Sequence, residues 1–102
     1  MIVSVIYPKT ETSTFDHVYY VQKHIPLVHH YWDHHGLRGI EVLRGTGSLG
    51  GAAAYELIAL LDFESNEAFL AAAGAHADDV MGDIPHFSNI QPFVQFNDPV
   101  AL

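Results

Sequence analysis

Residues 53–63 read AAYELIALLDF, and this stretch decides the fold. Successive side chains of a β-strand point to opposite faces of its sheet. One face of this strand would carry Tyr55, Leu57, Ala59 and Leu61. The other face would carry Ile58 and Leu60. Both faces are largely apolar, which is expected of a strand that is covered on both sides. We therefore predict a sheet whose two faces are both buried.

The segments on either side of this stretch alternate between strand and helix patterns. Residues 1–7 form a β-branched run with a period of two. Ser13 begins a capping-box pattern for a first helix, and Gly36 supplies its stop. Ser65 and Gly82 bound a second helix in the same way. The predicted elements are strands over 1–7, 37–44, 53–63 and 90–96, and helices over 15–35 and 65–82.

The predicted order βαββαβ is that of the split-βαβ, ferredoxin-like α+β fold. In this fold both helices lie on one face of an antiparallel four-stranded sheet, so the other face is left uncovered. A second copy of the sheet is the simplest cover, and two sheets packed face to face would form a dimeric α/β barrel. We therefore predict a single domain over residues 1–102 that pairs as a homodimer.

The composition restricts the classes of partner and chemistry. Twelve acidic residues stand against four basic ones, and a formal charge of −8 disfavours nucleic acid and anionic membranes as partners. No apolar run approaches the roughly 18 residues of a membrane helix, and no secretory signal is visible, so we predict a cytoplasmic protein. The chain has no cysteine. Its chemistry must therefore use oxygen or imidazole groups.

A candidate catalytic group lies on the first predicted helix. Asp16, Tyr20 and His24 recur at intervals of four and would share one face of a straight helix. A phenol beside an imidazole could orient a substrate oxygen and transfer a proton, with Asp83 as a carboxylate partner. The alternative is a solvated polar face, because the helical wheel puts Tyr20 and His24 opposite the apolar stripe. A third role for His24 is structural, capping a kink.

Pro26 lies inside the predicted helix and lacks the amide hydrogen for a bond to the carbonyl of Gln22. We therefore predict a kink near His24 and Ile25 that divides the helix into two segments and turns the imidazole inward.

The second predicted helix is rich in small residues between Ala68 and Ala77. Small residues either pack closely on the sheet or leave space for a pocket. An apolar pocket for a small organic ligand would be bounded by Tyr19, Trp32, Tyr55, Phe69 and Phe87. Each of these aromatic residues is equally compatible with an ordinary core position.

His30 and His34 have the helical spacing of metal ligands, and His29, Asp33 and His35 lie beside them. However, no catalytic glutamate lies between the two, and adjacent histidines point in different directions. We predict that no metal is required. The histidines would then form a solvated or interface cluster, with at most a fortuitous affinity for nickel or zinc.

Residues 45–50 read GTGSLG and match the glycine fingerprint of dinucleotide sites. That fingerprint must open a helix whose amino end faces a pyrophosphate, whereas a strand follows here. We therefore predict no bound cofactor.

Three segments of the chain resemble the EthD family, which is named for a bacterial gene cluster that degrades ethyl tert-butyl ether. The similar segments are residues 15–27 with the motif His24-Ile25-Pro26-Leu27, residues 55–69, and residues 80–88. The resemblance implies a dimeric ferredoxin-like barrel, and it assigns family positions to His24 and Asp83. The histidines around Trp32 lie outside the family pattern. The wider barrel superfamily includes cofactor-free monooxygenases, isomerases, cyclases, haem-handling proteins and members with no known reaction.

Two functions follow as expectations. The first is a small oxidoreductase or isomerase-like enzyme that acts on an apolar or aromatic carbonyl compound in a catabolic pathway, with His24, Tyr20 and Asp83 transferring protons. No redox cofactor motif is visible, so oxidation would depend on the substrate itself or on a partner protein that carries a cofactor. The second is a non-catalytic carrier or accessory protein that holds a hydrophobic intermediate in the same pocket.

Overall fold

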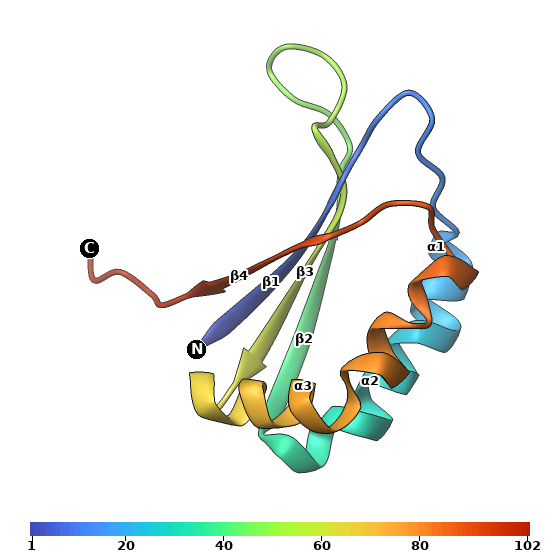
Figure 1. The fold of residues 1–102 in the computed structure, drawn as a ribbon. Helices are drawn as coiled ribbons and strands as arrows, with labels where there is room; N and C mark the ends of the chain where they lie inside the picture. Colours follow the sequence, from blue (N-terminus) through green and yellow to red (C-terminus); the bar gives the residue numbers. More distant parts are fainter.

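The computed structural model describes residues 1–102 and contains one four-stranded antiparallel sheet with the helices on one of its faces (Figure 1). The strands follow the order β2-β3-β1-β4, which places β2 and β4 at the edges. Their bounds are Ile2–Pro8 for β1, Leu37–Arg44 for β2, Tyr55–Phe63 for β3 and Phe93–Asn97 for β4. All three strand pairs are antiparallel. The predicted ferredoxin-like fold is therefore confirmed.

The first predicted helix is interrupted by a π-helical turn. It comprises α1 (His17–Tyr19), the π segment η1 (Tyr20–His24), α2 (Ile25–Trp32) and the 3₁₀ turn η2 (Asp33–His35). The Ile25 amide donates to the carbonyl of Tyr20, five residues earlier, and Pro26 follows in the first turn of α2. The break near His24 is therefore confirmed, and it takes the form of a π-bulge, a feature that is frequent at functional sites.

The second helix, α3 (Asn66–Met81), is followed by the 3₁₀ turn η3 (Ile84–His86). Ser65 caps α3, because its hydroxyl accepts from the Ala68 amide at 3.0 Å. The helical backbone is interrupted at His76, where φ is −139° and ψ is 25°. None of the helices is both long and apolar enough to cross a membrane.

The cap of the first helix differs from the prediction. Asp16, three residues after Ser13, accepts from the Tyr19 amide at 3.0 Å. The Ser13 hydroxyl instead bonds the backbone of Thr10 in a turn. The predicted stop is confirmed, since Gly36 ends the segment with φ of 95°, and a Cβ there would lie 2.9 Å from Cβ of Ala68.

The buried face of the first helix is also different from the one expected. Tyr20 and His24 are only 2% and 4% exposed, whereas Val18 is 64% exposed. The interpretation of Tyr20 and His24 as a solvated polar face is therefore wrong. The buried series continues at intervals of four through Val28 and Trp32, which share one face of α2 and pack in the core.

The two faces of the sheet differ in what covers them. Side chains of Val3, Tyr7 and Leu61 point toward the helices and are buried. The opposite face carries apolar side chains that keep solvent contact, namely Ile2, Ile6, Leu43, Ile58 and Leu60. The Cα atoms extend over 39 × 38 × 19 Å, and the short dimension matches one sheet plus one helical layer.

The connection between β2 and β3 forms a projecting loop over residues 45–54 (Figure 1). A short bridge between Ser48 and Gly51 closes its tip. The loop leads directly into β3, so the glycine pattern does not open a helix as a dinucleotide site requires.

Candidate functional site

A histidine, an aspartate and a tyrosine meet near the junction of η1 and α2. Nδ1 of His24 lies 3.0 Å from Oδ2 of Asp83, and the Tyr19 hydroxyl donates to Oδ1 of the same carboxylate at 2.9 Å. The side chains of His24 and Asp83 are only 6% and 11% exposed. Because a carboxylate only accepts hydrogen bonds, Nδ1 of His24 carries a proton and donates it. In the neutral ring, Nε2 is then an acceptor.

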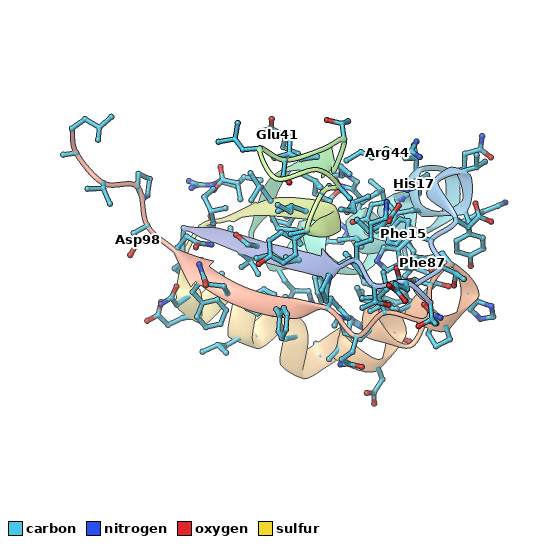
Figure 2. The ribbon with its side chains drawn as sticks, turned by 90° about the horizontal axis from the view of Figure 1, so that it is seen from above. Phe15, His17, Glu41, Arg44, Phe87 and Asp98 are labelled. Atoms are coloured by element: carbon cyan, nitrogen blue, oxygen red, sulfur yellow. The ribbon has the colours of Figure 1, made fainter.

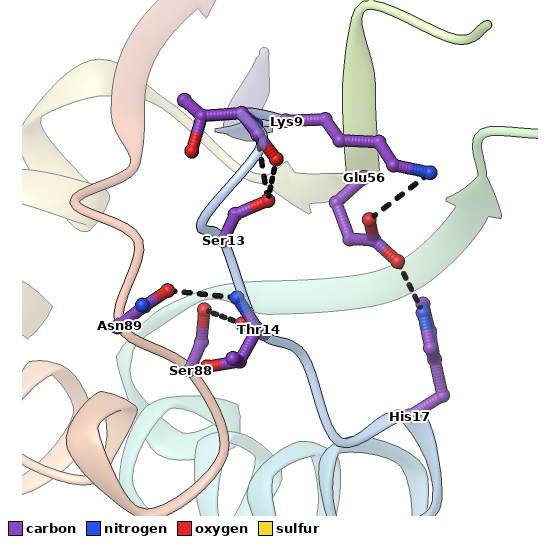
Figure 3. Close-up of polar contacts among 8 residues, drawn as sticks. Lys9, Ser13, Thr14, His17, Glu56, Ser88 and Asn89 are labelled. Atoms are coloured by element: carbon purple, nitrogen blue, oxygen red, sulfur yellow. Dashed lines mark hydrogen bonds and ion pairs between the residues drawn. The ribbon is translucent and has the colours of Figure 1, made fainter.

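The loop that carries Asp83 is fixed to the segment before α1. The Ser88 hydroxyl donates to the Thr14 carbonyl at 2.7 Å, and the Thr14 amide donates to the side chain of Asn89 at 2.8 Å (Figure 3). These bonds join residues that are 74 and 75 positions apart in the sequence. They hold the end of this loop against the start of the helical segment that presents His24.

An aromatic cluster surrounds the imidazole. Tyr20 stacks on His24 with ring centroids 5.2 Å apart, and the Phe87 ring lies 4.7 Å from it. Phe15 packs against both Tyr20 and Phe87 at 5.3 Å. Figure 2 shows Phe15 and Phe87 together at one end of the sheet, opposite the end that leads to Asp98. The cluster shields the imidazole from bulk water and restrains its plane.

His24 also lines a small cavity between the sheet and the helices. The cavity has a volume of about 20 Å³, enough for one water molecule or one substrate oxygen. Eleven of its twelve lining residues are apolar or aromatic, and His24 is the exception. The lining residues are Val5, Tyr7, Tyr20, His24, Ile25, Val28, Trp32, Ile40, Ala59, Leu61, Val80 and Met81.

The protonation states at this site suit proton transfer. Burial lowers the pKa of His24, and the hydrogen bond to Asp83 opposes that shift only in part. The imidazole is therefore neutral at pH 7 and can accept a proton at Nε2. Burial raises the pKa of Tyr20, so its phenol remains protonated. The hydrogen bond to Asp83, followed by burial, raises the pKa of Tyr19. The site thus combines a neutral base with neutral donors.

The lowered pKa of His24 predicts a pH dependence of stability. The unfolded chain takes up a proton at histidine near the ordinary pKa of about 6.5, whereas folded His24 does so only at lower pH. The contribution of neutral His24 is therefore complete above about pH 6.5 and is lost as pH falls through the folded pKa. The free energy of unfolding should thus fall more steeply between about pH 7.5 and about pH 5.5 in the parent than in His24→Asn. Denaturant titrations at the two pH values check this, and equal slopes would contradict the prediction.

The structure brings the three predicted catalytic residues together, since Tyr20, His24 and Asp83 form one connected group. Asp16, which shares their sequence spacing, is exposed and serves as the helix cap. Tyr19 joins the group through its hydrogen bond to Asp83.

The five predicted pocket residues do not share one cavity: Tyr19 bonds Asp83, and the other four lie in different environments. Trp32 lines the cavity, and Phe87 packs against the ring of His24. Phe69 packs against Trp32 and Phe63 in the core, outside the cavity lining. Tyr55 is 44% exposed at the start of β3. Among the small residues of α3, Ala72 is fully buried, and its carbonyl accepts from the Trp32 indole at 3.2 Å. Ala71, Gly74 and Ala75 are exposed.

The histidines that follow Pro26 do not converge. His29 pairs with Asp33 at 2.8 Å, and both side chains are more than two-fifths exposed. His30 and His34 are exposed. No group of three histidine, aspartate or glutamate side chains in the structure has an arrangement that could hold a metal ion.

Sequence reasoning did not single out Tyr7 as a site residue. Its ring is 1% exposed, lines the cavity and packs edge-on against Tyr20 with centroids 6.1 Å apart. The period of two in β1 does place Tyr7 on the same face as Val3 and Val5. The alternation in β1 therefore predicted which face of the sheet carries Tyr7, but not its contact with Tyr20.

The chain was compared with known proteins. No protein-family model and no curated protein matches it. Among solved structures, it is similar to an EthD-like protein from Ralstonia eutropha JMP134, with 31% sequence identity and a TM-score of 0.85 over 92% of this chain and 86% of that one. It also resembles an ethyl tert-butyl ether degradation (EthD) family protein from Bacillus halodurans C-125, with 20% identity and a TM-score of 0.61 over 93% of this chain and 97% of that one. The second similarity shows the fold alone.

Proposed function

Because the chain belongs to the EthD family, we propose that it handles a small organic molecule at the site built around His24. The function that this site supports best is cofactor-free proton transfer on an apolar or aromatic carbonyl compound. The enzyme would belong to a catabolic pathway. It would be isomerase-like, or an oxidoreductase in which the substrate itself reacts without a redox cofactor. The observation that carries the proposal is a buried neutral imidazole, held by Asp83, at the wall of an apolar cavity.

Each of the three residues has a separate proposed role. Nε2 of His24 accepts a proton from the carbon next to the substrate carbonyl. Asp83 fixes the ring through Nδ1 and stabilises the imidazolium that forms, as the carboxylate does in other histidine-based sites. Tyr20, whose phenol is protonated, donates to the substrate oxygen. The apolar body of the substrate would contact Trp32 and the aromatic side chains near Asp83.

A deuterium-exchange assay tests the enzymatic proposal. A panel of aryl and alkyl ketones is incubated with the protein in D₂O, and deuterium at the carbon next to the carbonyl is measured by mass spectrometry. If His24 acts as a base, deuterium should enter the ketone faster with the protein than in the same buffer without it. Exchange at the buffer rate across the panel would contradict proton transfer on this substrate class.

The alternative function is a non-catalytic carrier of a hydrophobic intermediate. The nearly complete apolar lining of the cavity favours it. Native mass spectrometry of protein purified from its source distinguishes the two. A carrier retains a stoichiometric organic molecule and shows no exchange, whereas an enzyme turns its substrate over.

We also propose that the chain forms a homodimer through the sheet face opposite the helices. Ile6 pairs there with Ile58 in the register of β1 and β3, and Leu60 lies two residues further along β3 on the same face. None of the three is fully buried within one chain. The Leu43 side chain extends this apolar surface to β2 and is 44% exposed. A contiguous apolar surface of this kind is unusual on a soluble monomer. An isologous contact between two such faces would cover it in both chains.

The proposed dimer predicts a specific effect of Leu60→Asp. The substitution places a charge within the proposed interface, on the same face as Glu41 of the neighbouring strand, so its desolvation and the repulsion of like charges should dissociate the dimer. Leu49→Asp, in the exposed β2–β3 loop, is the matched control and should leave the dimer intact. Sedimentation equilibrium at micromolar concentration reports the mass of each variant. A monomeric parent protein would contradict the proposed dimer.

A further inference from the structure

Two buried phenols border the cavity beside His24. Tyr7, from β1, and Tyr20, from η1, are 1% and 2% exposed, and both line the cavity. Their rings contact each other edge-on with centroids 6.1 Å apart. Neither hydroxyl forms a hydrogen bond with another protein group, which is unusual for tyrosines buried to this degree.

The two hydroxyls are nevertheless not sealed in the core. Every side-chain nitrogen and oxygen that is completely enclosed in this structure has a hydrogen-bond partner. The hydroxyls of Tyr7 and Tyr20 have none, so both must border a space that admits a water-sized group. Both side chains line the same cavity, so we assign both hydroxyls to that space. The same argument applies to Nε2 of His24, which has no protein partner.

We infer that Tyr7 and Tyr20 together bind one oxygen atom of the substrate and stabilise the negative charge that develops on it. This inference rests on the proposed function and narrows its substrate class to carbonyl compounds that can form an enolate. The volume of about 20 Å³ fits one substrate oxygen, so the rest of the substrate extends out of the cavity. The lining residues that remain partly exposed are all apolar: Val5, Ile25, Ile40 and Met81.

Burial raises the pKa of Tyr7 and of Tyr20, and the proximity of Tyr20 adds to the rise at Tyr7. Both phenols therefore remain protonated and act as donors throughout the physiological range. Two donors that are already positioned in a dry site stabilise an oxyanion more effectively than water does, because they need no reorganisation.

The reaction step balances without an oxidant or a metal ion. The C–H bond next to the carbonyl breaks, and its proton moves to Nε2 of His24. Its electron pair forms the carbon–carbon double bond of the enolate, and the π pair of the carbonyl moves to the oxygen. The hydroxyls of Tyr7 and Tyr20 donate to that oxygen. Return of the proton from His24 to carbon restores the carbonyl compound or gives an isomer.

Binding of para-nitrophenol tests the phenol pair independently of turnover. Its phenolate resembles an enolate, joins an oxyanion to an apolar ring and absorbs visible light. The parent protein should bind the phenolate form and increase its absorbance in mildly acidic buffer. Tyr7→Phe and Tyr20→Phe should each weaken this binding by roughly tenfold to a hundredfold, the usual effect of removing one hydrogen bond to a charged group. Tyr31→Phe removes a hydroxyl outside the cavity lining and is the matched control.

The outcomes separate this inference from the proposed function. If both variants bind para-nitrophenol as the parent does, the paired-donor inference is overturned, even where the parent catalyses deuterium exchange. If the variants lose binding and the parent catalyses no exchange, the oxygen site stands and the proposed enzymatic function fails. If a variant does not fold, a crystal structure of the parent protein with para-nitrophenol tests the inference instead. The phenol oxygen should lie within hydrogen-bond distance of both hydroxyls, and any other position would overturn the inference.

Discussion

Replacement of His24 by asparagine should remove most of the deuterium exchange while leaving the chain folded. Asparagine keeps a polar side chain of similar reach, and its amide can still donate to Asp83. It has no titratable nitrogen and cannot accept the proton at the position of Nε2. Loss of a general base costs roughly 10²- to 10⁴-fold in rate, and we expect a decrease of this size in the rate constant for exchange.

His34→Asn is the control for this experiment, because His34 is exposed and lies outside the cavity lining. Circular dichroism of both variants shows whether the fold is retained. If His24→Asn exchanges deuterium as fast as the parent while His34→Asn does not, the reactive histidine lies in the later part of the helical segment.

The strands were the most predictable part of the fold, because alternation of side chains is a local signal. The predicted and observed bounds of β2, Leu37–Arg44, are identical. The last strand begins three residues later than predicted, at Phe93, since the preceding Pro92 has no amide to donate to a neighbouring strand. The order of elements predicted an antiparallel four-stranded sheet, and the observed strand order places β1 between β3 and β4.

The helical wheel put Tyr20 and His24 opposite the apolar stripe, whereas the predicted kink turned the imidazole inward, and the burial of both side chains agrees with the second interpretation. Tyr20, Val28 and Trp32 belong to the same series at intervals of four, and all three are buried. A histidine in an apolar series can be buried when a carboxylate accepts a hydrogen bond from its ring. For His24 this carboxylate is Asp83, which lies 59 residues later in the sequence. No local pattern predicts a partner at that distance in the sequence.

The candidate site was predictable in part, since helical spacing grouped Tyr20 with His24 and the family resemblance supplied Asp83. His24 and Asp83 were assigned by the resemblance, and the structure joins them by a hydrogen bond. The contacts that fix the loop, from Ser88 and Asn89 to Thr14, had no sequence signal because serine and asparagine are ordinary loop residues. Their role is visible only in the folded chain, where Ser88 and Asn89 lie beside Thr14.

The core beside the site predicts the largest effect on stability. Phe63 is completely buried and packs against Phe69 at 5.2 Å and against Trp32, a residue of the cavity wall, at 6.0 Å. Phe63→Ala should destabilise the protein by about 3–5 kcal/mol, because it removes apolar contacts and leaves a void. This loss is a large part of a typical free energy of unfolding of about 5–15 kcal/mol. For a domain of this size it corresponds to a decrease in Tm of roughly 12–40 °C.

Leu70→Ala, at a position that is 58% exposed on α3, is the control for this loss and should change the stability by less than about 0.5 kcal/mol. Thermal unfolding followed by circular dichroism measures both variants. Tryptophan fluorescence adds a second readout, since the indole of Trp32 should become more accessible to solvent once the Phe63 ring is removed. Equal Tm values for the two variants would mean that Phe63 does not support the core, and the packing of Trp32 at the cavity wall would then need another explanation.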